Sequence, residues 1–193
     1  MFTLLSPGLA ALALAVLRNR SLAGLNHVRI AAWPLGLAAF GTELALTSTP
    51  LGQHQFGLMW GSAVWVAALI AMTVVLVRNA WVCSSAARWA WTIAAAGVLL
   101  NIVVVVVNGG HMPQSQEARM AAAVSAERVA GLAAEPGWRN VAPMTSETRL
   151  AWLGDVLPEP NWLPLHNVMS LGDVLLASGF AAVLYLATTP RPR

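Results

Sequence analysis

Three polar side chains lie inside long apolar stretches of this sequence, where they could bind an ion or transfer protons. They are Glu43, Asn101 and Asp173. Each is roughly 9–10 Å from the same end of its stretch, at about 1.5 Å of helical rise per residue. Polar groups at membrane depth usually face the interior of a helix bundle or a wet cavity. We therefore expect one shared polar pocket that faces outward.

The residues expected around the mouth of this pocket are also polar. They are Asn108, His111, Asp155, His166, Asn167 and Ser170. No arginine is expected at this depth, so the carboxyl groups are protonated, hydrogen-bonded to neutral donors, or bound to a cation. Histidines and acids are ligands for zinc or calcium, but their spacing here matches no standard metal motif. We therefore predict no metal and no cofactor.

The pentapeptide LGDVL occurs twice, at residues 153–157 and 171–175, and has an acid at its centre each time. In the second copy, Ser170 and Asp173 match the Ser-x-x-Asp pattern of a capping box at the start of a helix. Asp173 is therefore either a helix cap or a pocket residue, and the sequence leaves both roles open.

The first copy of the pentapeptide lacks this explanation. Trp152 occupies the place that a capping serine would take before Asp155. Asp155 therefore needs a tertiary partner. This partner is either structural, such as the backbone of residues 108–110 or Arg149, or it is a ligand.

The sequence contains few other candidates for catalytic or binding residues. Glu43 is either a functional intramembrane acid or the partner of an interhelical hydrogen bond with Asn101. The sequence has no Gly-x-Ser-x-Gly motif, and the single cysteine, Cys83, has no histidine in its own segment. We therefore predict no catalytic residues.

The composition indicates that these side chains are positioned by membrane helices. The chain has 193 residues, of which 58% are hydrophobic and only 10% charged. A soluble domain has about 25% charged residues. The net charge is +3, there is no lysine, and the arginines are scattered singly. Nucleic-acid binding needs a clustered basic face, so we expect none.

Five apolar segments approach the roughly 17–25 residues that cross a bilayer. These predicted spans of a single membrane domain, residues 1–193, are residues 2–17, 30–48, 56–77, 89–107 and 168–186. We expect residues 2–17 to be a retained helix, because the segment lacks the positive start of a signal peptide.

The charges predict the orientation in a bacterial cytoplasmic membrane. Arginines without acids occupy the connections after the first and third segments and the C-terminal tail. Short arginine-bearing loops stay in the cytoplasm. We therefore expect the N-terminus and the loop of residues 108–167 outside, and the C-terminus in the cytoplasm.

The long outer loop is expected to be structured. Asn108, Gly109, Gly110 and Pro113 form the pattern that ends a helix. An alanine-rich segment, residues 115–137, predicts a helix with Ser115 as its N-cap. Residues 145–167 predict a short helical turn followed by extended chain.

Three blocks carry a resemblance. They are NGGHMP (residues 108–113), TRLAWLGDVLP (148–158) and NVMSLGDVLL (167–176). Together they resemble a family of small bacterial multi-pass membrane proteins of unknown function, common in actinobacteria and related phyla. The matching positions are Asn108, Gly109, Gly110, Met112, Pro113, Leu153, Gly154, Asp155, Pro158, Asn167, Gly172 and Asp173. The resemblance implies a membrane location and no assigned reaction.

The sequence therefore predicts an all-α integral membrane protein, a five-helix bundle with a partly helical outer loop. Its expected partners are the lipid bilayer and other membrane subunits. The favoured function is an accessory, assembly or scaffold subunit of a membrane complex. The alternatives are a small-molecule or ion binder or transporter with an outward-facing polar pocket, or an enzyme at the outer leaflet.

Overall fold

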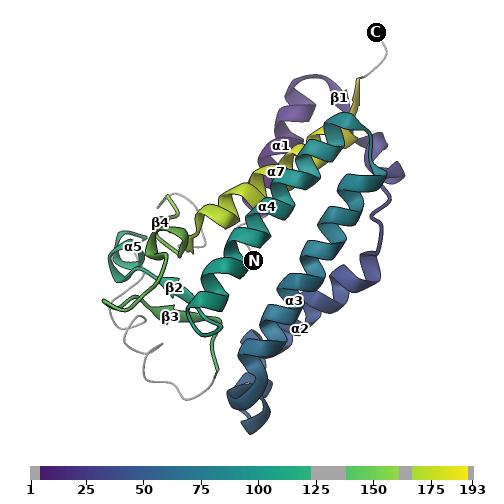
Figure 1. Cartoon of the computed structure of the whole chain (residues 1–193). Helices are drawn as coiled ribbons and strands as arrows, with labels where there is room; N and C mark the ends of the chain where they lie inside the picture. Colours follow the sequence, from purple (N-terminus) through teal and green to yellow (C-terminus); the bar gives the residue numbers. More distant parts are fainter. Residues whose placement is uncertain (1–4, 123–137, 161–166, 191–193) are drawn as a thin grey trace.

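Long helices dominate the computed structural model, which describes residues 5–122, 138–160 and 167–190 (Figure 1). The long helices are α1 (Leu5–Leu17), α2 (Trp33–Ser48), α3 (Gln55–Val82), α4 (Ser85–Val107) and α7 (Leu171–Ala187). Each falls on one of the apolar segments expected to be helical. By length and apolar composition, α3 and the Ala86–Val107 part of α4 are able to cross a membrane. The apolar helices Pro7–Leu17 and α7 are shorter.

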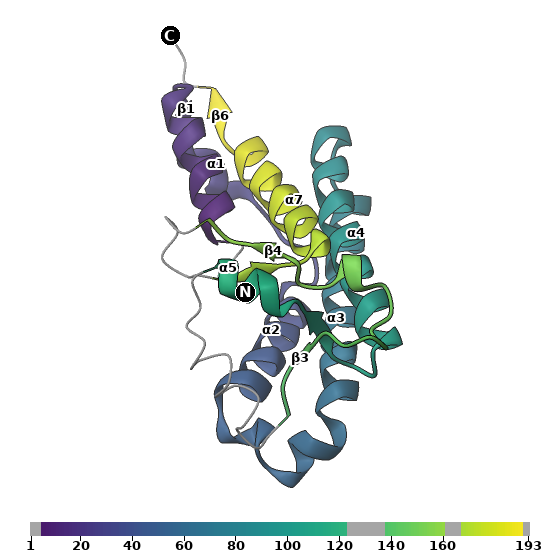
Figure 2. The same ribbon diagram turned by 90° about the vertical axis from the view of Figure 1, so that its left-hand side faces the viewer.

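The helices pack in an order that differs from their order along the chain. Helix α2 packs on α3, α3 on α4, α4 on α7, and α7 on α1 (Figures 1 and 2). The last helix is therefore inserted between α4 and the first helix. This order places α2 against α3 and α7 against α4.

Small residues allow α4 and α7 to approach closely. A Cβ atom added at Gly172 would lie 2.5 Å from the carbonyl oxygen of Gly97, and one at Gly179 would lie 2.6 Å from that of Ala90. Glycine and alanine at such contacts let helix backbones pack directly against each other in membrane proteins. The position of Gly172 in the second LGDVL copy is thereby explained, since no larger residue fits there.

Short strands organise the outer loop at one end of the helices (Figure 2). Strand β2 (Met112–Gln114) pairs in parallel with β3 (Val141–Pro143), and β4 (Leu157–Pro158) pairs antiparallel with β5 (Val168–Met169). The expectation of an all-α chain is wrong in this region. Strands of two or three residues are too short to produce an alternating sequence pattern, so the sequence did not predict them.

The described part of this loop contains two short helical elements. Helix α5 (Gln116–Ala121) begins after Ser115, whose hydroxyl accepts a hydrogen bond from the Ala118 backbone N–H at 3.2 Å. The rest of the expected helix falls on residues 123–137, outside the described residues. The expected helical turn is the 3₁₀ helix η4 (Ala151–Leu153).

At the opposite end of the bundle, the segment after α1 pairs with the segment after α7. After α1, strand β1 (Arg20–Ser21) leads into the 3₁₀ helix η2 (Leu22–His27) and pairs with β6 (Thr189–Pro190). The guanidinium of Arg20 donates to the Thr188 hydroxyl at 2.7 Å and lies 4.9 Å from the centre of the Tyr185 ring. The segments that follow α1 and α7 are therefore held together at this end.

A buried asparagine, not singled out by the sequence, fixes the start of α2. The Asn79 carboxamide accepts from the Ala31 backbone N–H at 2.8 Å and donates to the Ala31 carbonyl at 3.0 Å. Ala32, the next residue, has a left-handed backbone with φ of 58°. At the other end of α2, the 3₁₀ helix η3 (Pro50–Gly52) connects it to α3.

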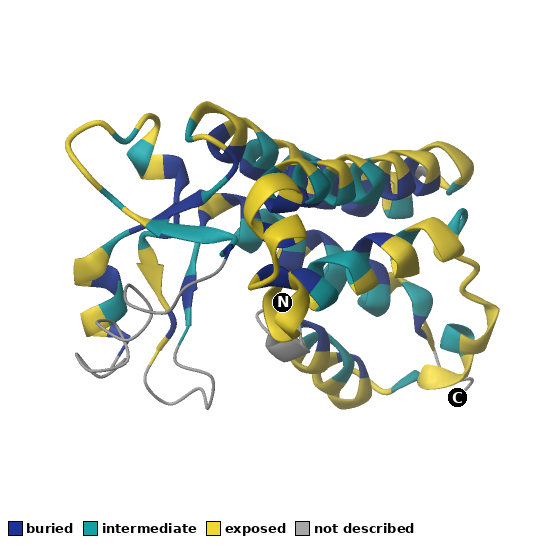
Figure 3. Cartoon of the chain, turned by 90° about the horizontal axis from the view of Figure 1, so that it is seen from below, coloured by how far each residue is buried: buried dark blue, intermediate teal, exposed yellow. Residues whose placement is uncertain are grey.

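The helices keep large apolar side chains on their outer faces, and exposed residues line them in Figure 3. In the most apolar part of α3 only 22% of the residues are buried, against 50% in α4. Exposed side chains of α3 include Leu58, Met59, Trp60, Ile70 and Trp81. The buried side of the α3–α4–α7 group is formed by residues such as Leu76, Trp91, Val98 and Val183.

Candidate functional site

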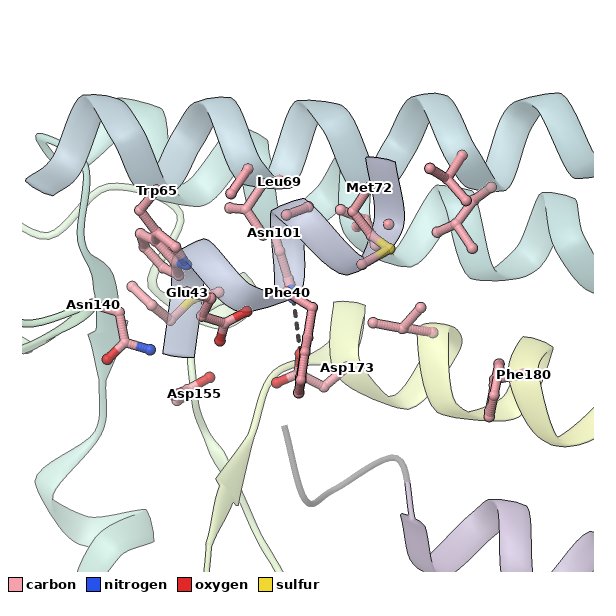
Figure 4. Close-up of a pocket in the computed structure, with 18 of the residues that line it drawn as sticks. Phe40, Glu43, Trp65, Leu69, Met72, Asn101, Asn140, Asp155, Asp173 and Phe180 are labelled. Atoms are coloured by element: carbon pink, nitrogen blue, oxygen red, sulfur yellow. Dashed lines mark hydrogen bonds between the residues drawn. The ribbon is translucent and has the colours of Figure 1, made fainter. Parts of the chain in front are cut away.

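A cavity of about 790 Å³ is lined by α2, α3, α4, α7 and the outer loop (Figure 4). Most of its wall is apolar, with Phe40 from α2, Leu69 and Met72 from α3, and Leu176 and Phe180 from α7. Ligand pockets are typically of this size and mostly apolar, with a few polar groups that orient the ligand.

The polar lining residues come mainly from the outer part of the helices and from the loop. They are Glu43, Asn101, Gln114, Arg119, Asn140, Asp155, Asn167 and Asp173. Residues 65–76 of α3 line the wall over roughly 16 Å of helix, at about 1.5 Å per residue. The cavity is therefore amphipathic, with an apolar body and a polar end.

The structure brings five of the candidate pocket residues into the lining of this cavity: Glu43, Asn101, Asp155, Asn167 and Asp173. Ser170 is fully buried beside them. Asn108 and His111 lie elsewhere in the outer loop, and His166 lies outside the described residues.

Asp173 is both a helix cap and a cavity residue. Its backbone N–H donates to the Ser170 hydroxyl at 2.9 Å, and its carboxylate accepts from the Ser170 N–H at 3.0 Å, which completes the expected capping box. Its other oxygen accepts from the Asn101 amide at 2.9 Å. The Ser170 hydroxyl donates to the side-chain oxygen Oδ1 of Asn101 at 2.9 Å. Asn101 thus links α4 to the first turn of α7.

Glu43 does not make the interhelical hydrogen bond with Asn101 that was expected as one alternative. Both ends of the Asn101 carboxamide are engaged by Ser170 and Asp173. Within residues 5–122, 138–160 and 167–190, no donor is positioned on the Glu43 carboxylate. Figure 4 shows this carboxylate inside the cavity, on the same side as Asp155 and Asp173.

Asp155 is held by the strands rather than by the predicted partners. Its backbone N–H donates to the Pro113 carbonyl at 2.8 Å, and its carbonyl accepts from the Ser115 N–H at 2.9 Å. Its carboxylate accepts from the side chain of Gln114 at 3.1 Å. The expectation that residues 108–110 or Arg149 would be its partner is wrong, because Asp155 forms a bridge with Gln114.

The surroundings of Asp155 favour its neutral form. The side chain is only 7% exposed. Burial raises the pKa of this carboxyl well above its usual value of 3.8, the negative charge of Asp173 raises it further, and the Gln114 hydrogen bond opposes both effects. The carboxyl of Asp155 is therefore protonated more easily than that of an exposed aspartate.

Asn108 instead connects the outer loop to the helices. Its carboxamide donates to the Arg149 carbonyl at 2.8 Å and accepts from the Arg149 N–H at 2.9 Å. Gly109 and Gly110 follow with left-handed φ angles of 72° and 88°. A Cβ at Gly154 would lie 2.5 Å from the carbonyl oxygen of Pro113. Gly154 therefore packs directly against the backbone of β2, next to Asp155.

The sequence did not predict Trp65 as a cavity residue. The residue is 4% exposed, and its indole Nε1–H is a buried donor without a hydrogen-bond partner among the described residues. In Figure 4 the indole nitrogen is turned into the cavity, toward Glu43. Trp65 is one of nine tryptophans. Nothing in the sequence distinguishes it from those at helix ends.

Trp138 lies in the same buried cluster as Trp65, and its ring also lies beside that of His111. The rings of Trp65 and Trp138 are 5.9 Å apart and packed edge to face. Trp138 donates to the Ser62 hydroxyl at 2.9 Å, and His111 contacts the Arg139 carbonyl through Nδ1 at 2.7 Å. Among the described residues, no group of three His, Cys, Asp or Glu side chains could hold a metal ion.

Comparison with known proteins places this geometry in a family without an assigned role. A family model described as a Family of unknown function (DUF5317) matches residues 37–185. The match includes all three sequence blocks and every described residue at the polar end of the cavity, so the resemblance expected from those blocks is confirmed. No curated protein and no solved structure matches the chain.

Proposed function

The chain belongs to this family of unknown function, DUF5317, and we propose that it is a multi-pass membrane protein that binds an amphipathic small molecule. The amphipathic cavity of about 790 Å³ carries this proposal. An apolar chain would lie against α2, α3 and α7, and a polar group would lie at the end that contains Glu43 and Asp155.

Exposed apolar surface supports the membrane location. A core helix of a soluble protein would be mostly buried, whereas the apolar window of α3 is 22% buried. Trp60, Trp81 and Trp89 are 55%, 81% and 69% exposed. Continuous exposed apolar faces of this kind are lipid or protein contacts. In the proposed topology the protein crosses the bacterial inner membrane five times. The polar end of the cavity faces outward and the C-terminus lies in the cytoplasm, in agreement with the arginine distribution.

The accessory, assembly or scaffold role expected from the sequence is the second candidate. The same exposed tryptophans on α3 and α4 could contact other subunits instead of lipid. Ligand binding is preferred because a scaffold needs no cavity, and large cavities are costly in a packed helix bundle.

Two glycines of α2 provide a matched test. Gly36 lines the cavity, and a Cβ atom there would meet only Val75, at 3.7 Å, which is an ordinary contact. Gly41 lies on the same helix, and a Cβ atom there would have nothing within 4 Å. Gly36→Phe would therefore occupy the cavity, whereas Gly41→Phe would add the same ring outside it.

The measurement is saturable photolabelling in lipid nanodiscs with a diazirine-bearing dodecyl probe, mapped by peptide mass spectrometry. We expect labelling within residues 65–76 that excess unlabelled probe suppresses in the wild type and in Gly41→Phe. Gly36→Phe is expected to weaken it about tenfold or more, which corresponds to about 1.4 kcal/mol of binding free energy. Equal labelling of both variants, or labelling that excess probe does not suppress, would refute ligand binding in this cavity.

A further inference from the structure

We propose that the polar end of the cavity recognises a cationic headgroup of the amino-alcohol type: an ammonium group that donates to the carboxyl groups of Glu43 and Asp155, with a neighbouring oxygen that accepts a hydrogen bond from Trp65 Nε1. This inference rests on the proposed binding of an amphipathic molecule and specifies the chemistry of its polar group.

The first observation is the balance of charges around the cavity. Three carboxyl groups line it, from Glu43, Asp155 and Asp173, whereas Arg119 is the single basic side chain among its described lining residues. Buried charges are stable only when they are paired and hydrogen-bonded. Arg119 and the N-terminal amino group already favour the ionised form of Asp155 by their positive charge, and an ammonium group would add a further positive charge and further hydrogen-bond donors.

The second observation is that the three carboxyl groups accept different numbers of hydrogen bonds within the protein. Asp173 accepts from the Ser170 N–H and from Asn101, so both of its oxygens are engaged. Asp155 accepts one side-chain hydrogen bond, from Gln114. Glu43 has no donor within the described residues. Acceptor capacity therefore remains at Glu43 and Asp155, where the donors of a ligand would bind.

The third observation is independent of the acids. Trp65 Nε1 is a buried donor without an acceptor in the described part of the chain. Tryptophan N–H groups usually find a partner when they are buried. Its indole nitrogen faces the cavity near Glu43 (Figure 4). A group that satisfies both residues needs a donor and an acceptor close together, as in an amino alcohol.

The same geometry disfavours anionic headgroups. A phosphate, sulfate or carboxylate would accept from Trp65 and Arg119 but would lie among three acids. Like charges brought together at low dielectric cost several kcal/mol at an interface. A neutral alcohol would satisfy Trp65 without compensating the negative charge.

The test compares four molecules that share a dodecyl chain: N-dodecylethanolamine, dodecylamine, dodecanol and dodecanoate. Each is used to displace the photoreactive dodecyl probe from wild-type protein in nanodiscs, with concentrations corrected for partition into the lipid. We expect dodecylamine to compete about tenfold better than dodecanol, because charge-assisted hydrogen bonds are roughly twice as strong as neutral ones. We expect N-dodecylethanolamine to compete best and dodecanoate worst.

Two substitutions test separately where the ammonium group and the neighbouring oxygen of the headgroup bind. Glu43→Gln is expected to reduce the preference for dodecylamine over dodecanol, whereas Glu117→Gln, at an exposed acid of α5 outside the cavity, leaves it unchanged. Trp65→Phe is expected to remove the advantage of N-dodecylethanolamine over dodecylamine and to preserve the preference for amine over alcohol.

The possible results separate this inference from the function on which it rests. Displacement by dodecanol or dodecanoate as strong as by the amines would overturn the headgroup assignment and leave a binding cavity. An amine preference that Glu43→Gln does not change would also overturn it. Failure of all four molecules to displace the probe would overturn both proposals.

Discussion

At the polar end of the cavity, single residues combine structural and binding roles. Asp173 caps α7 through Ser170 and also receives the Asn101 amide. Asp155 bridges to strand β2 through its backbone, and its carboxylate accepts a hydrogen bond from Gln114. The LGDVL pentapeptide is therefore used twice for different purposes. One copy starts helix α7, and the other carries an acid in the loop of residues 108–167.

A pH dependence of stability follows from Asp155. Its pKa is raised by burial in the folded protein, from an ordinary value of 3.8. Between these two pKa values the folded protein binds more protons than the unfolded one, so the free energy of unfolding falls as the pH rises. This contribution to stability is complete below about pH 4 and is lost as the pH rises through the folded pKa.

Asp155→Asn should remove this dependence, because an amide keeps an acceptor for Gln114 and carries no charge. We expect the variant to match the wild type near pH 4 and to exceed its thermal stability at pH 7–8. Thermal unfolding of the purified protein between pH 4 and 8 measures the difference. Glu147→Gln, at an exposed acid, serves as the control. Parallel curves for wild type and Asp155→Asn would show that the acid does not titrate in this way.

Local sequence patterns predicted some of these residues and missed others. The capping box at Ser170 was predictable because both of its hydrogen bonds lie within four consecutive residues. The partner of Asp155 was not, since Gln114 is 41 residues away and is brought near by strand pairing. Trp65 was missed because its significance depends on the lack of an acceptor in three dimensions.

Among the elements, α4 and α7 are in close backbone contact. Their backbones meet at Gly97 and Gly172. A Cβ at Gly172 would lie 2.0 Å from the side-chain oxygen Oδ1 of Asn101. This contact also sets the position of the Asn101–Asp173 hydrogen bond. Any separation of the two helices would therefore alter the polar end of the cavity.

Gly172→Ala should destabilise the protein by about 1–3 kcal/mol, the usual cost of overpacking a closely fitted contact. Gly41→Ala, on α2, has no atom within 4 Å of the added Cβ and should be neutral or stabilising by up to about 1 kcal/mol, from helix propensity alone. Unfolding of both variants in mild detergent by titration with dodecyl sulfate compares them. Equal stability of the two would contradict the close α4–α7 contact.

Hydropathy predicted the long helices to within a few residues, because each has a continuous apolar sequence. Helix α2 begins at Trp33 rather than at Ile30, since Asn79 holds the Ala31 backbone and Ala32 is left-handed. Helices α3 and α4 extend beyond the predicted spans at the end that carries Arg78 and Arg88. The paired strands were not predictable, because they are stabilised by contacts between distant segments.

For the whole molecule, the order of packing determines the cavity. Helix α2 packs on α3 and α7 packs on α4, and all four helices line the cavity, so it is bounded by segments far apart in sequence. The sequence predicted a polar pocket from matching depths along separate helices. It could not predict the apolar body of the cavity, which depends on which helices are neighbours.

The proposed orientation predicts where Cys83 lies. This half-buried cysteine is at the end of α3, between Arg78 and Arg88, and should face the cytoplasm. A membrane-impermeant maleimide should leave Cys83 unlabelled in intact cells and label it in inside-out vesicles. In a Cys83→Ser background, Gln53→Cys in the opposite connection should be labelled in intact cells. Reversed labelling of the two sites would invert the topology.

The most direct measurement of the central claim is native mass spectrometry of the protein extracted gently from its own membrane. We predict that the wild type and Gly41→Phe retain one amphipathic molecule per chain, released on activation, and that Gly36→Phe retains none. The molecule released should carry a basic nitrogen if the headgroup inference holds. An identical mass for all three proteins after correction for the substitutions, with or without a bound molecule, would contradict ligand binding in the cavity between α2 and α7.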